Sequence, residues 1–407
     1  MRSSPYLLPQ KVAGAIDRAE VVELAAELVR IPSHRGLPRQ EEEVVRALAR
    51  YLAAHGVVAE TVEVAAGRPN LLATVRGARH GRHLLLCGHT DTVPLNDGDP
   101  GVGFSGELRD GWLLGRGAVD MKGAVAAMAG ALVALAESGA LAAGAVTLAA
   151  VVDEEMESLG AEHLLGSSFS ADGAVVGEPT GNRVCRGHRG LEWLAIELRG
   201  RPAHGGRPEA GINAIAAAAR FIARVERDLV PRFARRAHPL LGPPTINFGT
   251  IAGGDQPSTV AAFCVLTLDR RSLPGERYDE ICAELGELLA VVEGEMPGLS
   301  TAIRRLSGSM ATMEHVALET PAEHPLAQAA AAAFRAVRGG EAEFGAFPAW
   351  TDGALLAAYG GIPAIVLGPG DLALAHSPRE AVAVEELTEA ARLYAATALA
   401  FCVADRR

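Results

Sequence analysis

The sequence has few aromatic residues, few cysteines and no long apolar run. Phe, Trp and Tyr make up 4% of the 407 residues, and the five cysteines are not closely spaced. We therefore expect no disulfide framework, and the cysteines fit a reducing compartment such as the cytoplasm. The longest apolar run is Gly123–Ala136, which is shorter than the about 20 residues that span a bilayer. The first residues lack the apolar core of a signal peptide, so no membrane or secretory segment is expected.

A run of basic residues is also missing. The 49 acidic residues outnumber the 38 basic ones, and the net charge is -11. Because nucleic-acid binding needs clustered positive charge, a nucleic-acid partner is not expected. Hydrophobic residues make up 49% of the chain and charged residues 21%, which is the balance of an ordinary globular protein. At about 150 residues per domain, the length predicts two or three domains.

Apolar strands alternate with helical stretches in the first and last parts of the chain. The runs at 83–88, 145–152, 173–177 and 363–367 have no polar alternation, which is typical of strands that are buried on both faces. We therefore predict an α/β fold with a mostly parallel sheet covered by helices on both faces. This catalytic domain is predicted to comprise residues 1–185 plus 308–407.

The middle of the chain has a different order of elements. Strand-like and helix-like patterns alternate as β-α-β-β-α-β, at 190–200, 211–230, 244–254, 259–271, 278–294 and 300–306. This is the order of a ferredoxin-like α+β unit. We therefore predict an inserted domain at residues 186–307.

Residues that commonly bind metals follow four of the apolar strands, and one more precedes the Ala-rich helix. The set comprises His89, Asp120, Glu155, Glu178 and His376. Ligands of open α/β sheets bind at the carboxyl ends of the strands, so we expect these side chains to converge. Two imidazoles with several carboxylates suit zinc, cobalt or manganese. The set predicts two divalent ions bridged by Asp120, with Glu155 and His376 at one ion and His89 and Glu178 at the other.

Three neighbouring acidic residues receive other interpretations. Asp91 lies two residues after His89 on an extended segment, so both side chains face the same way and Asp91 can hold the far ring nitrogen. Asp153, at the end of its strand, is predicted to be a turn or cap residue. Glu157 is predicted to lie on a solvated face.

Several long motifs occur in a recognisable order, namely GHTDTVP, GRGAVDMKGAVAAM, DEEMESLGAEHLL, GEPT, AHGGRPEAGINAI, DRRSLPGE and GPGDLALAHSPREAV. Together they resemble the zinc-dependent amidohydrolase and exopeptidase family of acetylornithine deacetylase, succinyl-diaminopimelate desuccinylase, aminoacylase and carboxypeptidase G. The resemblance covers nearly the whole chain. It implies a catalytic domain, an inserted lid or dimerisation domain, and a homodimer formed through that lid.

The resemblance also implies individual roles. Glu154 is implied to be the general base, and the peptide bond after Asp120 is commonly cis in the family. His204 is implied to reach from the lid, often into the partner subunit's site, and to stabilise the oxyanion. The alternative for His204, a histidine that only serves its own loop, remains open.

The substrate contacts are implied less specifically. Arg271 aligns with an arginine that binds the substrate carboxylate, although a surface salt bridge is an equal alternative. Asn247 resembles a lid residue near the substrate, and backbone N–H groups around Gly370 are predicted to help hold a carboxylate. Many members have NVVPD where this chain has STVAA at 258–262, so the local turn and the substrate fit are expected to differ.

These features predict metal-assisted hydrolysis of the amide bond of an N-acyl amino acid. The motifs GEPT and GPGDLALAHSPRE are most similar to the acetylornithine and succinyl-diaminopimelate branch. A carboxypeptidase or dipeptidase of the same fold is the nearest alternative. A non-catalytic metal-binding relative is less favoured, because such a protein does not need Glu154. A nucleotide-binding module is disfavoured because GRGAVDMKG lacks the GxGxxG spacing.

Overall fold

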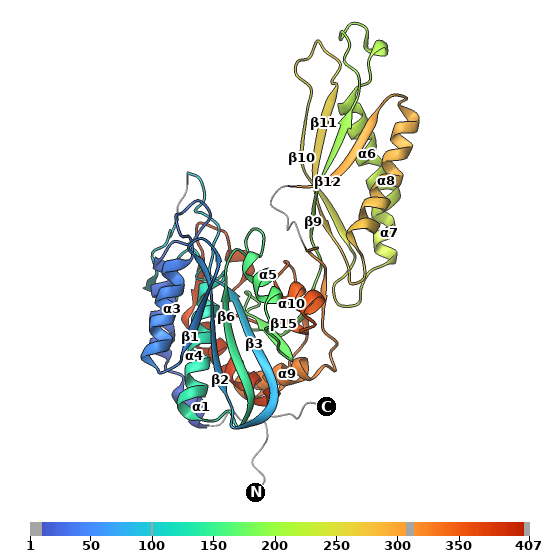
Figure 1. Ribbon diagram of the computed structural model, residues 1–407. Helices are drawn as coiled ribbons and strands as arrows, with labels where there is room; N and C mark the ends of the chain where they lie inside the picture. Colours follow the sequence, from blue (N-terminus) through green and yellow to red (C-terminus); the bar gives the residue numbers. More distant parts are fainter. Residues whose placement is uncertain (1–9, 99–100, 307–312, 403–407) are drawn as a thin grey trace. The chain divides into compact units, whose positions relative to one another are not determined.

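The computed structural model describes residues 10–98, 101–306 and 313–402. The chain forms two compact units (Figure 1). The first unit comprises Met1–Gly187, Leu318–Phe347 and Thr351–Arg407, and the second comprises His188–Ala317 and Pro348–Trp350. The second unit is therefore inserted into the sequence of the first.

A mixed sheet forms the centre of the first unit. In the described part of the chain it has nine strands, in the order β1-β2-β6-β3-β7-β15-β8-β13, with β14 paired to β8. Strands β6, β3, β7 and β15 pair in parallel, whereas β1–β2, β2–β6 and β15–β8 are antiparallel pairs. The strands are β1 (Ala59–Ala65), β2 (Arg68–Arg76), β3 (Arg79–His89), β6 (Ala143–Val151), β7 (Gly173–Val176), β8 (Cys185–His188), β13 (Leu318–Glu319), β14 (Gly345–Phe347) and β15 (Ala364–Val366).

The predicted α/β class is confirmed, and the parallel pairs lie where the apolar runs are. Strands β6, β7 and β15 are buried almost throughout, and β3 is buried over its second half. Strand β1 has no buried residue and no apolar run, so the sequence did not predict it. The chain reverses at Gly67, where φ is +70°, and β1 therefore pairs antiparallel with β2.

Two groups of helices cover the two faces of this sheet (Figure 1). In one group, α4 (Lys122–Ser138) packs against β3 and β6 and contacts α2 (Arg18–Arg30) and α11 (Val384–Cys402). In the other group, α10 (Gly353–Gly360) packs against β7, β15 and α5 (Leu159–Gly166). The remaining elements are α1 (Gln10–Ala15), α3 (Glu42–Ala54), α9 (Pro325–Arg338), the short helix η3 (Leu372–Leu374) and a small sheet of β4 (Glu107–Arg109), β5 (Trp112–Leu114) and β16 (Ala381–Ala383).

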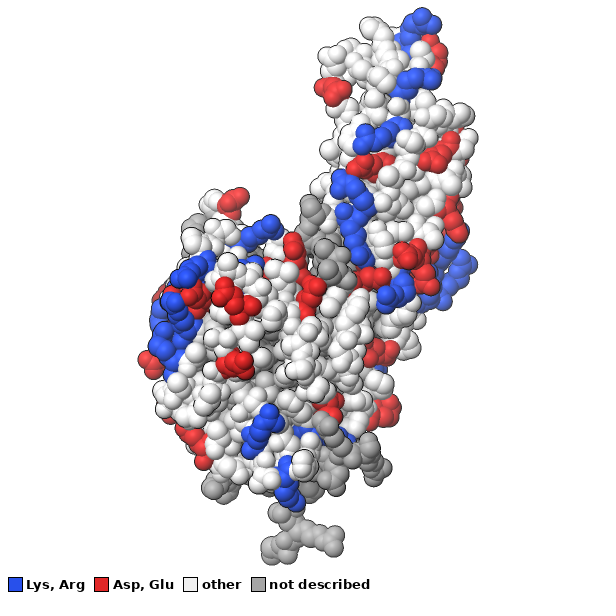
Figure 2. Space-filling view, viewed as in Figure 1, with Lys and Arg blue, Asp and Glu red and all other residues white. Residues whose placement is uncertain are grey.

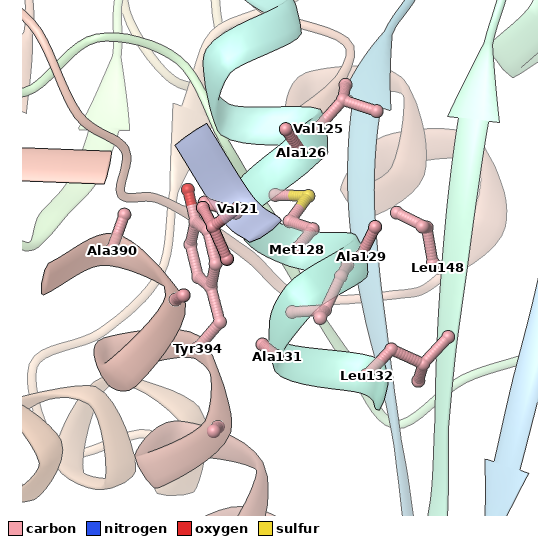
Figure 3. Close-up of a cluster of buried hydrophobic side chains, with 14 of the residues drawn as sticks. Val21, Val125, Ala126, Met128, Ala129, Ala131, Leu132, Leu148, Ala390 and Tyr394 are labelled. Atoms are coloured by element: carbon pink, nitrogen blue, oxygen red, sulfur yellow. The ribbon is translucent and has the colours of Figure 1, made fainter. Parts of the chain in front are cut away.

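Helix α4 is buried on nearly all sides, as its Ala-rich sequence predicts. Figure 3 shows Met128 of α4 near Val21 of α2 and Tyr394 of α11, and Leu148 of β6 belongs to the same core cluster. The Tyr394 hydroxyl donates a hydrogen bond of 2.9 Å to the Leu367 carbonyl, so this polar group is satisfied inside the core. Because α4 begins just after Asp120, its packing fixes the backbone of a predicted metal ligand. Among the described residues, none of the helices combines the length and hydropathy needed to cross a membrane.

The second unit has a four-stranded antiparallel sheet in the order β10-β11-β9-β12. Leu194, Ile196 and Leu198 of β9 alternate along the strand and pack with Leu266 of β11 in the core under the helices. The chain order β-α-β-β-α-β confirms the predicted ferredoxin-like class. The elements are β9 (Glu192–Arg199), η1 (Pro208–Ala210), α6 (Ala214–Arg224), the π-helical turn η2 (Val225–Leu229), α7 (Val230–Arg235), β10 (Thr245–Gly253), β11 (Phe263–Arg271), α8 (Tyr278–Glu295) and β12 (Ser300–Arg305).

Two buried histidines flank Trp350 in the second unit. The ring centroids of His188 and His315 lie 6.2 and 4.5 Å from that of Trp350, both with T-shaped geometry. Burial lowers the pKa of each imidazole to about 4. A histidine whose folded pKa is below its unfolded value binds its proton preferentially in the unfolded state. The free energy of unfolding is therefore expected to fall as the pH drops from about 6.5 to about 4.

A His315→Phe substitution tests this pH dependence. Phenylalanine retains an aromatic ring against Trp350 but cannot bind a proton, so the variant should lose less stability on acidification. We expect the difference to approach about 1.4 kcal/mol for each pH unit within this window. Urea unfolding at pH 7 and pH 5, followed by tryptophan fluorescence, measures it. His163→Gln, on an exposed turn of α5, is the control. Equal losses in the wild type and His315→Phe would contradict the argument.

Candidate metal centre

The predicted ligands of the first unit come from the carboxyl ends of adjacent strands. His89 is the last residue of β3 and lies opposite Val151, the last residue of β6. The turn with Glu154 and Glu155 follows β6 directly, and Glu178 follows β7, which pairs in parallel with β3. The sheet therefore delivers these side chains to one edge, as the strand order requires.

Asp120 lies between the two imidazoles. Its Oδ1 is 2.9 Å from His89 Nε2, and its Oδ2 is 3.2 Å from His376 Nε2. Each carboxylate oxygen thus faces a different imidazole, which is the arrangement that a bridging ligand needs. Glu155 Oε1 lies 3.1 Å from the same His376 Nε2.

Two more carboxylates surround His89. Glu178 Oε1 and Glu154 Oε2 lie 3.7 and 3.9 Å from His89 Nε2. Two sets of three residues bring their ligand atoms within 4.8 Å of one another: His89 with Glu154 and Glu178, and His89 with Asp120 and Glu155. The structure therefore brings together all five predicted ligands, with Glu154 beside them.

The chemistry of this cluster fits divalent cations. Glu178 Oε1 is buried and has no hydrogen-bond partner among the described residues, and such an oxygen is costly unless a cation binds it. Burial, together with neighbouring carboxylates, raises the pKa of Glu154 and of Glu178. Several buried carboxylates at one point need positive charge nearby, and the donor set of imidazole and carboxylate is one that zinc, cobalt and manganese accept.

In the protein without ions, the imidazoles supply this positive charge. Hydrogen bonds to Asp120 and Glu155 raise the pKa of His376 to about 10. Burial acts to lower the pKa of His89, but hydrogen bonds to Asp120 and Asp91 raise it overall. Metal binding would therefore displace protons from both rings. The His376 side chain is 48% exposed and that of His89 is 1% exposed, so the centre opens to solvent on the His376 side.

Asp91 positions both the first imidazole and the acidic turn. His89 Nδ1 lies 3.0 Å from the Asp91 backbone oxygen and 3.5 Å from its carboxylate. The same carboxylate accepts hydrogen bonds from the backbone N–H groups of Glu154 and Glu155, at 3.2 and 3.1 Å. The ring nitrogen thus contacts the backbone carbonyl of Asp91 in addition to the carboxylate that the sequence suggested. Asp91 has a further role that the sequence did not indicate, because it anchors the turn that carries Glu154.

Asp153 holds the start of this turn. Its backbone has φ of +71°, its carboxylate accepts a 2.7 Å hydrogen bond from Arg68, and its carbonyl accepts from the N–H of Ser158. Arg68 is also paired with the buried Glu41.

His376 resembles Asp153 in its backbone conformation, because it is also a non-glycine residue with positive φ, at +59°. Such conformations are uncommon and often mark functional sites.

Glu380 supports the loop that carries Asp120. One of its carboxylate oxygens accepts hydrogen bonds from the N–H groups of Gly117, Val119 and Asp120, at 2.8, 3.1 and 3.3 Å. The other oxygen is paired with Arg116. The Asp120–Met121 peptide bond is cis. Sequence analysis missed Glu380, because its partners lie about 260 residues away in the chain.

Asp352 is a second carboxylate that the sequence did not indicate. It is 2% exposed, and neither of its side-chain oxygens has a hydrogen-bond partner in the described part of the chain. Burial raises its pKa to about 7. In the sequence Asp352 resembles an ordinary cap residue before α10, so no local signal distinguishes it.

His204, Asn247 and Arg271 belong to the second unit. The His204 Nδ1 accepts a 3.0 Å hydrogen bond from the Gly206 N–H, which leaves its Nε2 as the protonated nitrogen. Asn247 is exposed on β10. Arg271 makes a bidentate ion pair with Asp269, at 2.8 and 2.9 Å. These contacts are those of the surface salt bridge, which was the alternative to a substrate contact.

The STVAA segment supports the loop of His204. The Gly205 N–H donates to the Ser258 carbonyl at 2.6 Å, and the Val260 N–H donates to the Ala203 carbonyl at 2.9 Å.

The N–H of Gly370, in the first unit, donates to Glu386 Oε2 at 2.7 Å. Gly370 therefore serves its own loop in this structure and is not a free donor.

The sequence is similar to those of known proteins. Residues 85–400 match the model of peptidase family M20/M25/M40. Acetylornithine deacetylase from Proteus mirabilis is 31% identical, over 95% of this chain and 97% of that protein. The enzyme of the same name from Klebsiella pneumoniae is 31% identical, over 88% and 92%.

Solved structures share the fold. An aminopeptidase from Bacillus cereus superimposes with a TM-score of 0.78 at 22% identity, over 95% of this chain and 100% of that one. A metallo-carboxypeptidase from Sulfolobus solfataricus has a TM-score of 0.77 at 17% identity, over 94% and 99%. A dinuclear metal-binding peptidase from Bacillus subtilis has a TM-score of 0.71 at 16% identity, over 94% and 97%.

Proposed function

The chain belongs to peptidase family M20/M25/M40 and is a metal-dependent amidohydrolase, and we propose that it removes the acyl group from an N-acyl amino acid. The observation that carries this proposal is the position of Asp120 between His89 and His376, with Glu154 beside them. The named acetylornithine deacetylases support the deacylase assignment, because their 31% identity extends over most of both chains. A carboxypeptidase or dipeptidase is the second candidate, because proteins of these names, from Sulfolobus solfataricus and human, share the fold.

We propose two divalent ions, most simply zinc, with cobalt or manganese as alternatives. His89 and Glu178 would hold one ion, Glu155 and His376 the other, and Asp120 would bridge them. When bound, such ions polarise the scissile carbonyl and lower the pKa of a water molecule.

The residues of the chain would then share the proton transfer and the charge. A carboxylate oxygen of Glu154 would accept the proton of the attacking water and pass it to the leaving amine nitrogen. Asp91 keeps the ring of His89 and the backbone of Glu154 in place. His204 would donate its Nε2–H to the oxyanion, and Arg271 and Asn247 would contact the substrate, with Arg271 leaving Asp269 to do so.

We also propose a homodimer formed through the second unit and a reducing, cytoplasmic location. Strand β10 ends the order of its sheet, so its outer edge can pair with another strand. Ile251 on this strand is 55% exposed. Sedimentation of the purified protein tests the dimer, and a strict monomer would contradict it.

All five cysteines are free, which supports the proposed reducing, cytoplasmic location.

A substrate panel tests the proposed activity. Zinc- and cobalt-loaded protein should hydrolyse N-acetyl, N-succinyl or N-formyl amino acids with a higher kcat/KM than dipeptides. Release of the free amino acid measures the reaction. A preference for dipeptides would select the peptidase instead.

His204→Ala is expected to lower kcat by about a hundredfold or more, the usual cost of losing one oxyanion donor. Metal content should not change, because His204 lies in the second unit. His238→Ala is a matched control, since the Nδ1 of His238 also accepts backbone N–H groups in a loop of the second unit. Equal kcat values for His204→Ala and His238→Ala would mean that His204 only serves its own loop.

A further inference from the structure

A basic cavity lies at the end of β3 opposite to His89. Its volume is about 690 Å³, and its lining includes Arg76, Arg79, His80, Gly81 and Gly144. No Asp or Glu of the described chain lines it. Because β3 runs from Arg79 to His89, at about 3.3 Å per residue the cavity is roughly 30 Å from the metal centre.

A bulge in β3 forms the wall of this cavity. Arg79 lies opposite Ala143 and His83 opposite Ala145, so β3 has two residues more than β6 over this interval. Two glycines make the bulge possible. A Cβ at Gly81 would lie 2.2 Å from the Cys402 carbonyl oxygen, and one at Gly144, where φ is +74°, would lie 2.1 Å from the Arg82 carbonyl oxygen. The bulge is therefore packed closely against the backbone at Cys402 and Arg82.

The basic side chains of this cavity make no ion pair among the described residues, and the Asp172 carboxylate is bonded to its wall, where it accepts a 2.7 Å hydrogen bond from the backbone N–H of His83. For the side chains of Arg76, Arg79 and His80, no hydrogen bond or ion pair with any other residue is found within the described ranges. Elsewhere, basic and acidic side chains are interspersed on the drawn surface (Figure 2), and arginines such as Arg46 and Arg338 pair with glutamates. His83 differs from its neighbours, since its Nε2 lies 2.7 Å from the Thr147 hydroxyl. Two unpaired guanidinium groups beside the imidazole of His80, in a chain of net charge -11, favour binding of an anion here.

We propose that this cavity, the β3–β6 end pocket, binds a small oxyanion that carries two or more negative charges. Arg76 and Arg79 supply planar guanidinium groups, which match the oxygen pairs of phosphates and carboxylates. The volume is in the range of small-molecule sites. The acidic surface of the chain repels a large polyanion, so a small one fits better. Phosphate compounds and polycarboxylates share this chemistry.

Calorimetric titration of the metal-loaded protein at low ionic strength tests the proposal. The probes are inorganic phosphate and propane-1,2,3-tricarboxylate, and the tighter one identifies the source of the oxyanion. Arg79→Gln is expected to weaken binding by about tenfold, and added salt should weaken it further. Arg392→Gln removes the same charge from an exposed position on α11 and should have no effect.

The Arg79→Gln variant also distinguishes anion binding in this pocket from anion binding at the metal centre. An anion bound to the metal ions would bind equally well to the wild type and to Arg79→Gln, and would compete with substrate. Equal affinities in the Arg79→Gln and Arg392→Gln proteins would overturn the proposal. The absence of saturable binding of either probe in the millimolar range would also overturn it. Both side chains are exposed, so thermal unfolding should confirm that each variant is folded.

Discussion

Glu154→Gln is expected to lower kcat by about a thousandfold or more, which is within the range that a general base contributes. Glutamine has nearly the same shape as glutamate but cannot accept a proton. Glu154 Oε2 lies 3.9 Å from His89 Nε2, whereas Asp120 makes the close contacts with both imidazoles. The amide should therefore leave the ligand framework intact. The backbone N–H that donates to Asp91 is also unchanged.

Metal content and kinetics together test this prediction. The variant should retain the metal stoichiometry of the wild type by plasma mass spectrometry, and KM should change much less than kcat. Glu157→Gln is the matched control, because Glu157 lies in the same turn and loses the same charge. Retained activity in Glu154→Gln would remove Glu154 as the base. Loss of metal from the variant would instead make Glu154 a ligand.

The pH dependence of kcat/KM is a second test of Glu154 as the general base. Burial, followed by the charge of Glu178, raises the pKa of Glu154 in the protein without ions. A base must be ionised, so activity should rise with pH on the acid side of the profile. Bound cations favour the carboxylate form and move this limb to lower pH. Glu154→Gln should remove the limb.

The sequence predicted those parts of the molecule that depend on local pattern. Continuous apolar runs identified β3, β6 and β7, and polar residues at their ends identified the candidate site. The structure brings the five candidate ligands together, while their metal-binding roles stay predictions. The β1–β2 hairpin was missed because β1 is an exposed edge strand without a recognisable apolar pattern.

Features that depend on tertiary contacts were not predictable in this way. Glu380 is an ordinary glutamate in the sequence, and only folding places it under the loop of Asp120. Asp352 is likewise an ordinary aspartate in the sequence, and it is buried in the folded chain. The pairing of Arg271 with Asp269 shows the opposite case, in which a residue suggested by a motif already has a partner. Sequence pattern therefore finds the candidate ligands, and the structure adds the residues that hold them in place.

Asp120→Asn is expected to reduce metal binding from two ions to one or fewer and to lower kcat/KM by at least about a thousandfold. The two oxygens of Asp120 face His89 and His376 separately. An amide offers one oxygen and one N–H₂ group, so it can serve only one of these positions. The buried cluster also loses one negative charge, which weakens its attraction for cations.

The loss should be specific to the bridge. Asp110→Asn removes the same charge from the exposed turn between β4 and β5, where φ is +51°, a conformation that asparagine tolerates. This control should retain both ions and full activity. If Asp120→Asn also retained two ions and wild-type kcat/KM, the two imidazoles would bind their ions independently. The carboxylate between them would then position the rings in the protein without ions, where it raises the pKa of His376, and would not join two metals into one centre.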